Sequence, residues 1–265
     1  MSEKDNSLED IEEETPIVED IAKSKYDLIK DISKNYAVYC EEIVKDYEIG
    51  DFIVRAVDNV SLSIQNGEFL VIVGPSGAGK TSLLNLLGGL DSPNKGTIYC
   101  FGVKISDMKE ESLTTWRLLN TGFVFQNYNL ISTLTAEENI MFPMNLSGVV
   151  FNEQRKRAKE LLKKMNLDER REHLPFQLSA GEQQRVAIAR ALANDPPMII
   201  ADEPTANLDK KTSQFIRDLF KNLKDKTRTI IIATHDDYLI SLADRIISFD
   251  DGTIKKEELI SDLDG

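Results

Sequence analysis

The stretch Phe69-Leu-Val-Ile-Val-Gly-Pro-Ser-Gly-Ala-Gly-Lys-Thr-Ser82 decides the fold. Five apolar residues, 69–73, lead into a glycine-rich turn, and leucines at helical spacing follow it. The turn fits the pattern G-x-x-x-x-G-K-[ST], which forms a phosphate-binding loop when a strand precedes it and a helix follows. A chance match would arise in roughly one per cent of chains of this length at average residue usage. The stretch therefore predicts a nucleoside triphosphate site.

The loop has the residue types that phosphate binding requires. Glycines let the backbone wrap closely around an anion, and the following helix presents its positive N-terminal end. We expect Lys80 to reach the β- and γ-phosphates and the Thr81 hydroxyl to be a ligand of Mg²⁺. The loop residues expected to hold the nucleotide are Gly74, Pro75, Ser76, Gly77, Ala78, Gly79, Lys80, Thr81 and Ser82.

Strands and helices alternate from residue 69 onward, which predicts an α/β fold with a mainly parallel sheet covered by helices. Ligand chemistry in such folds gathers at the C-terminal ends of the strands. The residues at the ends of the predicted strands include Gly74, Gln126, Asp202 and His235. We therefore expect these four positions to converge on one site.

Two adjacent carboxylates, Asp202 and Glu203, end an apolar strand. Beside a phosphate loop, an aspartate can hold Mg²⁺ and the next carboxylate can orient and deprotonate an attacking water. Acid pairs at strand ends are common without any function. The neighbouring Gln126 and His235 favour the catalytic interpretation.

Residues 36–68 alternate apolar and polar positions, with turn signals at Gly50-Asp51 and Asn66-Gly67. This pattern predicts an antiparallel sheet before the phosphate-loop strand. Tyr47 is expected in the loop before the second strand. Taken alone, Tyr47 is either a sheet or turn aromatic or a platform for a nucleobase.

The segment Leu178-Ser-Ala-Gly-Glu-Gln-Gln-Arg185 begins another helix. Ser179 and Glu182 have capping-box spacing, and so do Thr135 and Glu138 before an earlier helix. The local interpretation of Ser179 is a well-capped helix start and nothing more.

Composition excludes several classes of protein. The chain has 265 residues, which allows one large domain or two small ones, and its 41% hydrophobic and 29% charged residues are ordinary for a globular protein. No apolar run approaches the roughly 18 residues of a membrane span, and the N-terminus lacks the order of a signal peptide. The net charge of −13 disfavours nucleic-acid binding. Cys40 and Cys100 are expected to be free thiols in a reducing cytosol.

The acids are concentrated at the N-terminus. Residues 1–20 hold nine acids and one base, so we expect residues 1–35 to form an acidic, mobile extension. Residues 20–33 are compatible with a short amphipathic helix or with a solvated linker.

Residues 36–258 resemble the ATP-binding subunit of an ABC transporter, closest to the lipoprotein-release and macrolide-export group. The motifs that carry the resemblance are the phosphate loop 74–81, the glutamine loop at Gln126, the signature 178–184, the Walker B strand 199–205, the D-loop 206–209 and the switch histidine at His235. The resemblance assigns adenine stacking to Tyr47. It implies a P-loop NTPase domain over 36–265, with an antiparallel β subdomain and an inserted helical signature subdomain at about 127–190.

The resemblance also implies partners and a cycle. Two such domains would close head to tail around two ATP molecules with Mg²⁺. The signature residues Ser179, Ala180, Gly181 and Glu182, together with Asp209, would serve the nucleotide of the other subunit, and Gln126 would join Thr81 and Asp202 at the metal. An integral membrane permease would be driven by this closure, and the chain would sit at the cytoplasmic face of the membrane.

Two departures from the family pattern concern glycine. Ala180 replaces the first glycine of Leu-Ser-Gly-Gly, and Ala206 replaces a more usual glycine. If the backbone at Ala180 needs positive φ, trans-activation would be weakened, and otherwise the change is nearly neutral.

Other functions compete with transport. A soluble ABC ATPase of translation or DNA repair usually has two domains, coiled-coil insertions or a zinc module, and this chain has none of these patterns. A small-molecule kinase has no use for the signature segment. A permease-like complex that transmits force without moving a substrate would use the same ATPase cycle, and the sequence does not separate it from a transporter.

Overall fold

The computed structural model describes residues 35–224 and 227–260. The expected acidic tail and the amphipathic segment at 20–33 lie outside these residues. None of the helices within them is long and apolar enough to cross a membrane.

The phosphate-loop strand lies inside a six-stranded sheet with the order β10-β9-β3-β8-β7-β6. Neighbouring strands from β9 to β6 are parallel, and β10 runs antiparallel at one edge. The strands are β3 (Phe69–Val73), β6 (Thr121–Val124), β7 (Met198–Asp202), β8 (Thr229–Ala233), β9 (Arg245–Asp250) and β10 (Thr253–Leu259). The predicted mainly parallel sheet is confirmed.

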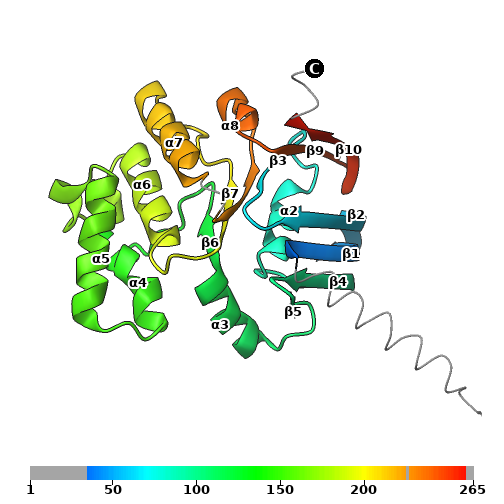
Figure 1. The fold of residues 1–265 in the computed structure, drawn as a ribbon, viewed down its shortest axis with the longest axis horizontal. Helices are drawn as coiled ribbons and strands as arrows, with labels where there is room; N and C mark the ends of the chain where they lie inside the picture. The colour runs from blue at the N-terminus through cyan, green and yellow to red at the C-terminus, as the bar shows by residue number, and fades with distance from the viewer. Residues whose placement is uncertain (1–34, 225–226, 261–265) are drawn as a thin grey trace, which may run out of the picture.

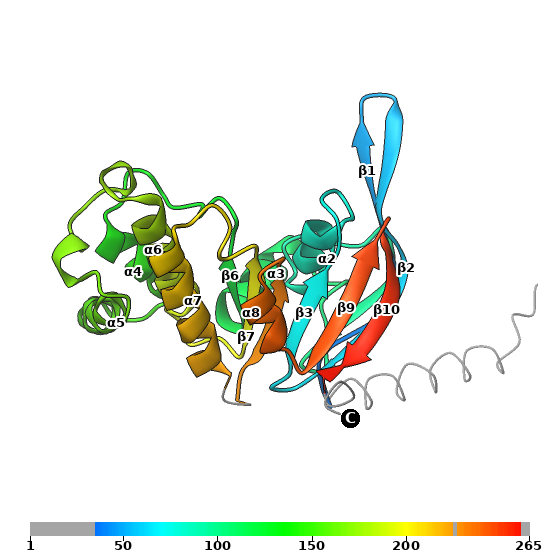
Figure 2. The same cartoon turned by 90° about the horizontal axis from the view of Figure 1, so that it is seen from above.

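A second, antiparallel sheet has the order β2-β1-β4-β5. Its strands are β1 (Tyr36–Ile49), β2 (Phe52–Gln65), β4 (Lys95–Cys100) and β5 (Val103–Lys104). The turn between β1 and β2 contains Gly50 with φ of 60°, so the predicted turn is confirmed. The hairpin tip extends beyond the rest of the molecule in Figure 2.

The predicted loop position of Tyr47 is wrong. β1 continues as far as Ile49, and Tyr47 pairs with Val54 of β2 inside the hairpin. The charged and polar residues near Tyr47 give this stretch a composition typical of loops, but cross-strand pairing with β2 keeps it extended.

Helices cover both the sheet and one end of the molecule. They are α2 (Lys80–Leu87), α3 (Glu110–Asn120), α4 (Ala136–Leu146), α5 (Phe151–Lys164), α6 (Ala180–Ala191), α7 (Lys210–Leu223) and α8 (Asp237–Ser241), with short 3₁₀ turns at Asp168–Arg170 and Pro175–Gln177. Figure 1 shows α4, α5 and α6 grouped on the side of β6, opposite β1 and β2. Both predicted capping boxes are present, at Thr135 of α4 and Ser179 of α6.

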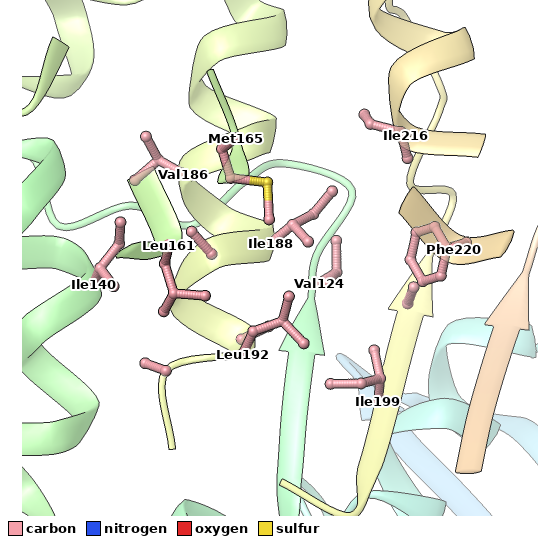
Figure 3. Packing of buried hydrophobic residues seen from close by; sticks show 14 of the residues in the cluster. Val124, Ile140, Leu161, Met165, Val186, Ile188, Leu192, Ile199, Ile216 and Phe220 are labelled. Atoms are coloured by element: carbon pink, nitrogen blue, oxygen red, sulfur yellow. The ribbon is translucent and has the colours of Figure 1, made fainter. Parts of the chain in front are cut away.

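Two hydrophobic clusters explain why β3 is apolar at every position. Leu70 and Ile72 belong to a cluster that joins the two sheets and α2, whereas Phe69 and Val71 belong to a cluster under α4–α7. A strand buried on both faces loses the alternation of polar and apolar residues. Figure 3 shows part of the second cluster, in which Val124 and Ile199 of the sheet face helical residues such as Ile188 and Phe220.

Cys40 and Cys100 are free and lie in the first cluster. Burial raises the pKa of Cys40 to about 12 and raises the pKa of Cys100 well above its ordinary value.

Candidate active site

The phosphate loop connects β3 to α2, and close backbone contacts require its fixed glycines. A Cβ at Gly74 would lie 1.8 Å from the carbonyl oxygen of Phe249. A Cβ at Gly79 would lie 2.1 Å from the carbonyl oxygen of Ala56, and Gly79 has φ of 98°. Only glycine fits both positions, so β2 and β9 fix the path of the loop from either side.

Lys80 folds back over this loop. Its ammonium donates to the carbonyl oxygens of Gly74 at 2.6 Å and Pro75 at 2.9 Å, and the residue is only 8% exposed. The positive charge is therefore held at the mouth of the glycine turn, where an anion would enter. This geometry fits the predicted phosphate contact.

A hydroxyl and a carboxylate meet at the start of α2. Thr81 Oγ1 donates to Asp202 Oδ2 at 2.6 Å, which joins the phosphate loop to the end of β7. Hydroxyl, carboxylate and the amide oxygen of Gln126 are hard oxygen donors that suit Mg²⁺. Within residues 35–224 and 227–260, no group of three or more His, Cys, Asp or Glu side chains is placed to hold a metal ion. A Mg²⁺ that keeps several waters and binds substrate phosphates needs no such cage.

Glu203 follows Asp202 in a strained position that the next strand stabilises. It has φ of 45°, and its N–H donates to the carbonyl of Ala233 at the end of β8. Its Oε1 lies 3.3 Å from Nε2 of His235. Burial raises the pKa of Glu203, and the nearby His235 and Lys80 oppose that shift. A carboxylate in this setting is a better proton acceptor than an exposed glutamate.

These residues line one cleft of about 860 Å³. The predicted site residues found in its wall are Tyr47, Ser76, Gly77, Ala78, Gly79, Lys80, Thr81, Ser82, Gln126, Asp202, Glu203 and His235. The cleft is therefore lined by residues 76–82 of the phosphate loop and by all four strand-end residues with predicted catalytic or metal roles, Gln126, Asp202, Glu203 and His235. It is large enough for a nucleotide.

Other predicted site residues lie outside the cleft wall. Gly74 and Pro75 contribute carbonyl groups to Lys80 behind the loop. Asp209 caps α7, where it accepts from the N–H groups of Lys211 and Thr212. Ser179, Ala180, Gly181 and Glu182 form the first turn of α6 and do not line the cleft either.

Ala180 is the first residue of α6, and its backbone does not have positive φ. An alanine at this position is therefore unstrained. The second signature glycine is different, because a Cβ at Gly181 would lie 2.7 Å from Oγ1 of Thr212. Ala206 also lacks positive φ.

The cleft contains residues that the sequence analysis did not identify. They come from β2, from the segment after β8 and from the turn between β9 and β10, and are Val54, Arg55, Ala56, Asp236, Asp251 and Gly252. Thr205, Ala206 and Asn207, which belong to the Walker B and D-loop motifs, also line the cleft. The N–H of Gly252 donates to the carbonyl of Ala78, which fixes this turn against the phosphate loop. Asp-Gly between two strands is a hairpin signal that could have predicted the turn, but not its position.

Residues 57–206 match the family described as ABC transporter. An uncharacterized ABC transporter ATP-binding protein of Methanocaldococcus jannaschii, MJ0796, is 45% identical over 229 residues, which is 84% of this chain and 97% of that protein. The lipoprotein-releasing system ATP-binding protein LolD of Bacteroides thetaiotaomicron is 45% identical over 205 residues, 77% of this chain and 94% of LolD. The macrolide export ATP-binding/permease protein MacB of Hyphomonas neptunium is 45% identical over 214 residues, 81% of this chain and 33% of MacB.

Solved structures agree with the sequence relatives. The dimeric post-hydrolysis structure of the ATP-binding cassette MJ0796, bound to ADP and Pi, has a TM-score of 0.80 and 44% identity. The match covers 84% of this chain and 98% of that one. A second dimeric MJ0796 structure matches with a TM-score of 0.80 and 43% identity. The chain therefore belongs to the ABC transporter family, in which it is an ATP-binding and ATP-hydrolysing subunit.

Proposed function

We propose that two copies of this chain close head to tail around two ATP molecules and that each active site combines residues of both copies. One observation carries the proposal: the start of α6 is capped and Ser179 and Ala180 are exposed, yet this helix start lies outside the nucleotide cleft of its own chain. A helix N-terminus is a ready site for a phosphate. The dimeric MJ0796 structures support a two-fold assembly.

The residues around the cleft would each bind a different part of the nucleotide. The amides of residues 74–82 and the Lys80 ammonium would hold the β- and γ-phosphates, and Tyr47 would stack on adenine. Thr81, Asp202 and Gln126 would hold Mg²⁺, which neutralises charge on the phosphate oxygens. Across the interface, the Ser179 hydroxyl and the amides of Ala180, Gly181 and Glu182 would face the γ-phosphate, with Asp209 beside them.

Hydrolysis follows from the position of Glu203. The carboxylate would take a proton from a water whose oxygen attacks the γ-phosphorus, while the bond from that phosphorus to the β–γ bridging oxygen breaks. The products are ADP and phosphate. His235, in contact with Glu203, would orient this carboxylate and the γ-phosphate, and Gln126 would orient the water.

Mixed dimers test whether the site is shared. The first variant, Lys80→Ala, has a defective phosphate loop and an intact signature. The second, Ser179→Asp, keeps a good N-cap but places a negative charge where the γ-phosphate would bind. Each variant alone should have little ATPase activity. A mixture should recover activity, because half of the chains can pair as heterodimers that contain one fully intact composite site.

Equal activity in the mixture and in the average of the separate variants would contradict the head-to-tail arrangement. Wild-type chain mixed with inactive Glu203→Gln chain provides the control for subunit exchange. Light scattering with ATP shows whether the two variants associate at all.

We further propose that an apolar groove beside Gln126 receives an integral membrane permease. The groove has a volume of about 510 Å³ and lies between β6, α3, α4 and the end of α6. Phe142 and Leu146 of α4 are 41% and 59% exposed there. MacB, a macrolide export ATP-binding/permease protein, joins ATP binding to a permease in one protein. Such a contact would place the chain at the inner face of the cell membrane.

Phe142→Asp is expected to lower the fraction of the chain that sediments with cell membranes at least several-fold, because it puts a charge in an apolar contact. Val150→Asp is a matched control, since Val150 is 67% exposed, stands at the N-cap position of α5 without a capping hydrogen bond and lies outside the groove. Equal sedimentation of both variants and wild type would remove the groove as the permease site.

A further inference from the structure

We propose that Asp91 is a positioning residue that fixes the ring of Tyr47 for the nucleobase. The inference rests on the proposed stacking of adenine on Tyr47. Asp91 does not line the cleft, and it lies in the loop that follows α2. It would act through Tyr47 and would not touch the nucleotide.

The contact between Asp91 and Tyr47 joins the two parts of the site. Tyr47 Oη donates to Asp91 Oδ2 at 2.9 Å. The other carboxylate oxygen, Oδ1, accepts from the Lys45 ammonium at 2.5 Å and from the N–H of Ser92 at 2.7 Å. The Asp91 N–H donates to the carbonyl of Asn85 in α2. Tyr47 of the antiparallel sheet is thereby tied to the helix that starts at the phosphate loop.

Lys45 completes the restraint on the ring. Its ammonium lies over the Tyr47 ring, 5.1 Å from the centroid, and its side chain is only 13% exposed. The cation therefore occupies one face of the ring and leaves the opposite face for a base. Val54, the cross-strand partner of Tyr47, also lines the cleft.

The physical advantage of this arrangement is preorganisation. A tyrosine that must be immobilised on binding loses side-chain entropy at that moment, which weakens affinity. Here the hydroxyl has a charged acceptor and the ring a cation on one face before any nucleotide binds. Asp91 is therefore expected to increase affinity for the base and to leave affinity for the phosphates unchanged.

Calorimetry with two ligands separates these contributions. ATP contains both base and phosphates, whereas inorganic tripolyphosphate contains only the phosphate chain. Tyr47→Phe removes the hydroxyl and keeps the ring, and Asp91→Ala removes its acceptor. Both variants should bind ATP about fivefold to tenfold more weakly, which is less than loss of a charge-assisted hydrogen bond to the ligand itself would give, because this contact acts on the base only through the ring. The tripolyphosphate affinity of Asp91→Ala should stay within about twofold of wild type, because Asp91 does not line the cleft. Tyr47 also has a side-chain hydrogen bond with Ser82 of the phosphate loop, so Tyr47→Phe is compared with Asp91→Ala through ATP affinity alone.

A double variant tests whether Tyr47 and Asp91 act through the same contact, and a control variant tests whether the effect is specific to Asp91. The double variant Tyr47→Phe/Asp91→Ala should bind ATP no more weakly than Asp91→Ala alone, because both changes break the same contact. Asp107→Ala removes an exposed acid paired with Lys104, outside the cleft, and should leave both ligands unaffected. Asp91→Asn should recover part of the ATP affinity.

The outcomes distinguish this inference from the proposed function. Equal loss of ATP and tripolyphosphate affinity in Asp91→Ala would overturn the inference and show that Asp91 only supports α2. Tyr47→Ala tests the base site itself, and wild-type ATP affinity in that variant would overturn adenine stacking. If Tyr47→Ala alone weakens ATP binding, stacking holds and the positioning role of Asp91 fails.

Discussion

Glu203→Gln is expected to lower kcat for ATP hydrolysis by about 10²–10⁴-fold, the range typical of a general base. The amide has nearly the same shape as the carboxylate but cannot accept a proton from water at neutral pH. The contact with Nε2 of His235 can persist, so the cleft should keep its form. Steady-state phosphate release measures the loss.

The same variant should bind ATP normally and accumulate as a closed dimer. In the proposed dimer, closure would depend on the γ-phosphate, and a chain that cannot cleave ATP would not release that contact. Size-exclusion chromatography with ATP should show a dimer for Glu203→Gln and mainly monomer for wild type after turnover. Glu111→Gln, an exposed acid in the first turn of α3, is the matched control. Turnover of ATP near the wild-type rate by Glu203→Gln would remove Glu203 as the base.

Lys80→Met is expected to weaken ATP binding by about tenfold to a hundredfold. A hydrogen bond to a charged group contributes roughly 1.5–3 kcal/mol, and about 1.4 kcal/mol corresponds to a tenfold change in affinity. Methionine preserves the apolar stem of Lys80, the buried first residue of α2, so the packing of the helix start should change little. Calorimetry with ATP measures the affinity.

Two controls separate binding from folding. Thermal unfolding without nucleotide should show a modest loss, because the carbonyl groups of Gly74 and Pro75 lose their donor. Lys210→Met changes an exposed lysine at the start of α7 and should bind ATP like wild type. Unchanged ATP affinity in Lys80→Met would contradict the phosphate-loop assignment.

Much of the fold and the site could be predicted because the decisive signals are local. The apolar run before Gly74, the lysine and threonine after it and the capping residues Thr135 and Ser179 each act within a few residues. Strand ends bearing Asp202 and His235 could be assigned to one edge because parallel strands share their C-terminal side.

The remaining features depend on contacts between distant segments. Ala56 and Gly252 reach the phosphate loop because β2 and the β9–β10 turn pack against it, and no local pattern encodes that packing. The polar residues around Tyr47 predict a loop, but pairing with β2 overrides this local polarity and keeps Tyr47 in a strand. Asp91 is 44 residues from Tyr47, and pairing of β4 with β1 in the antiparallel sheet brings the loop before β4 beside Tyr47.

The two native cysteines are buried, which makes this chain convenient for spectroscopy with attached probes. Cys40 and Cys100 are 1% and 0% exposed, and their raised pKa values leave almost no thiolate at neutral pH. The sequence contains no other cysteine. A single cysteine introduced on the surface would therefore react alone with a maleimide probe, without a prior cysteine-free background. Pairs of such probes would report the distance between subunits throughout the ATPase cycle.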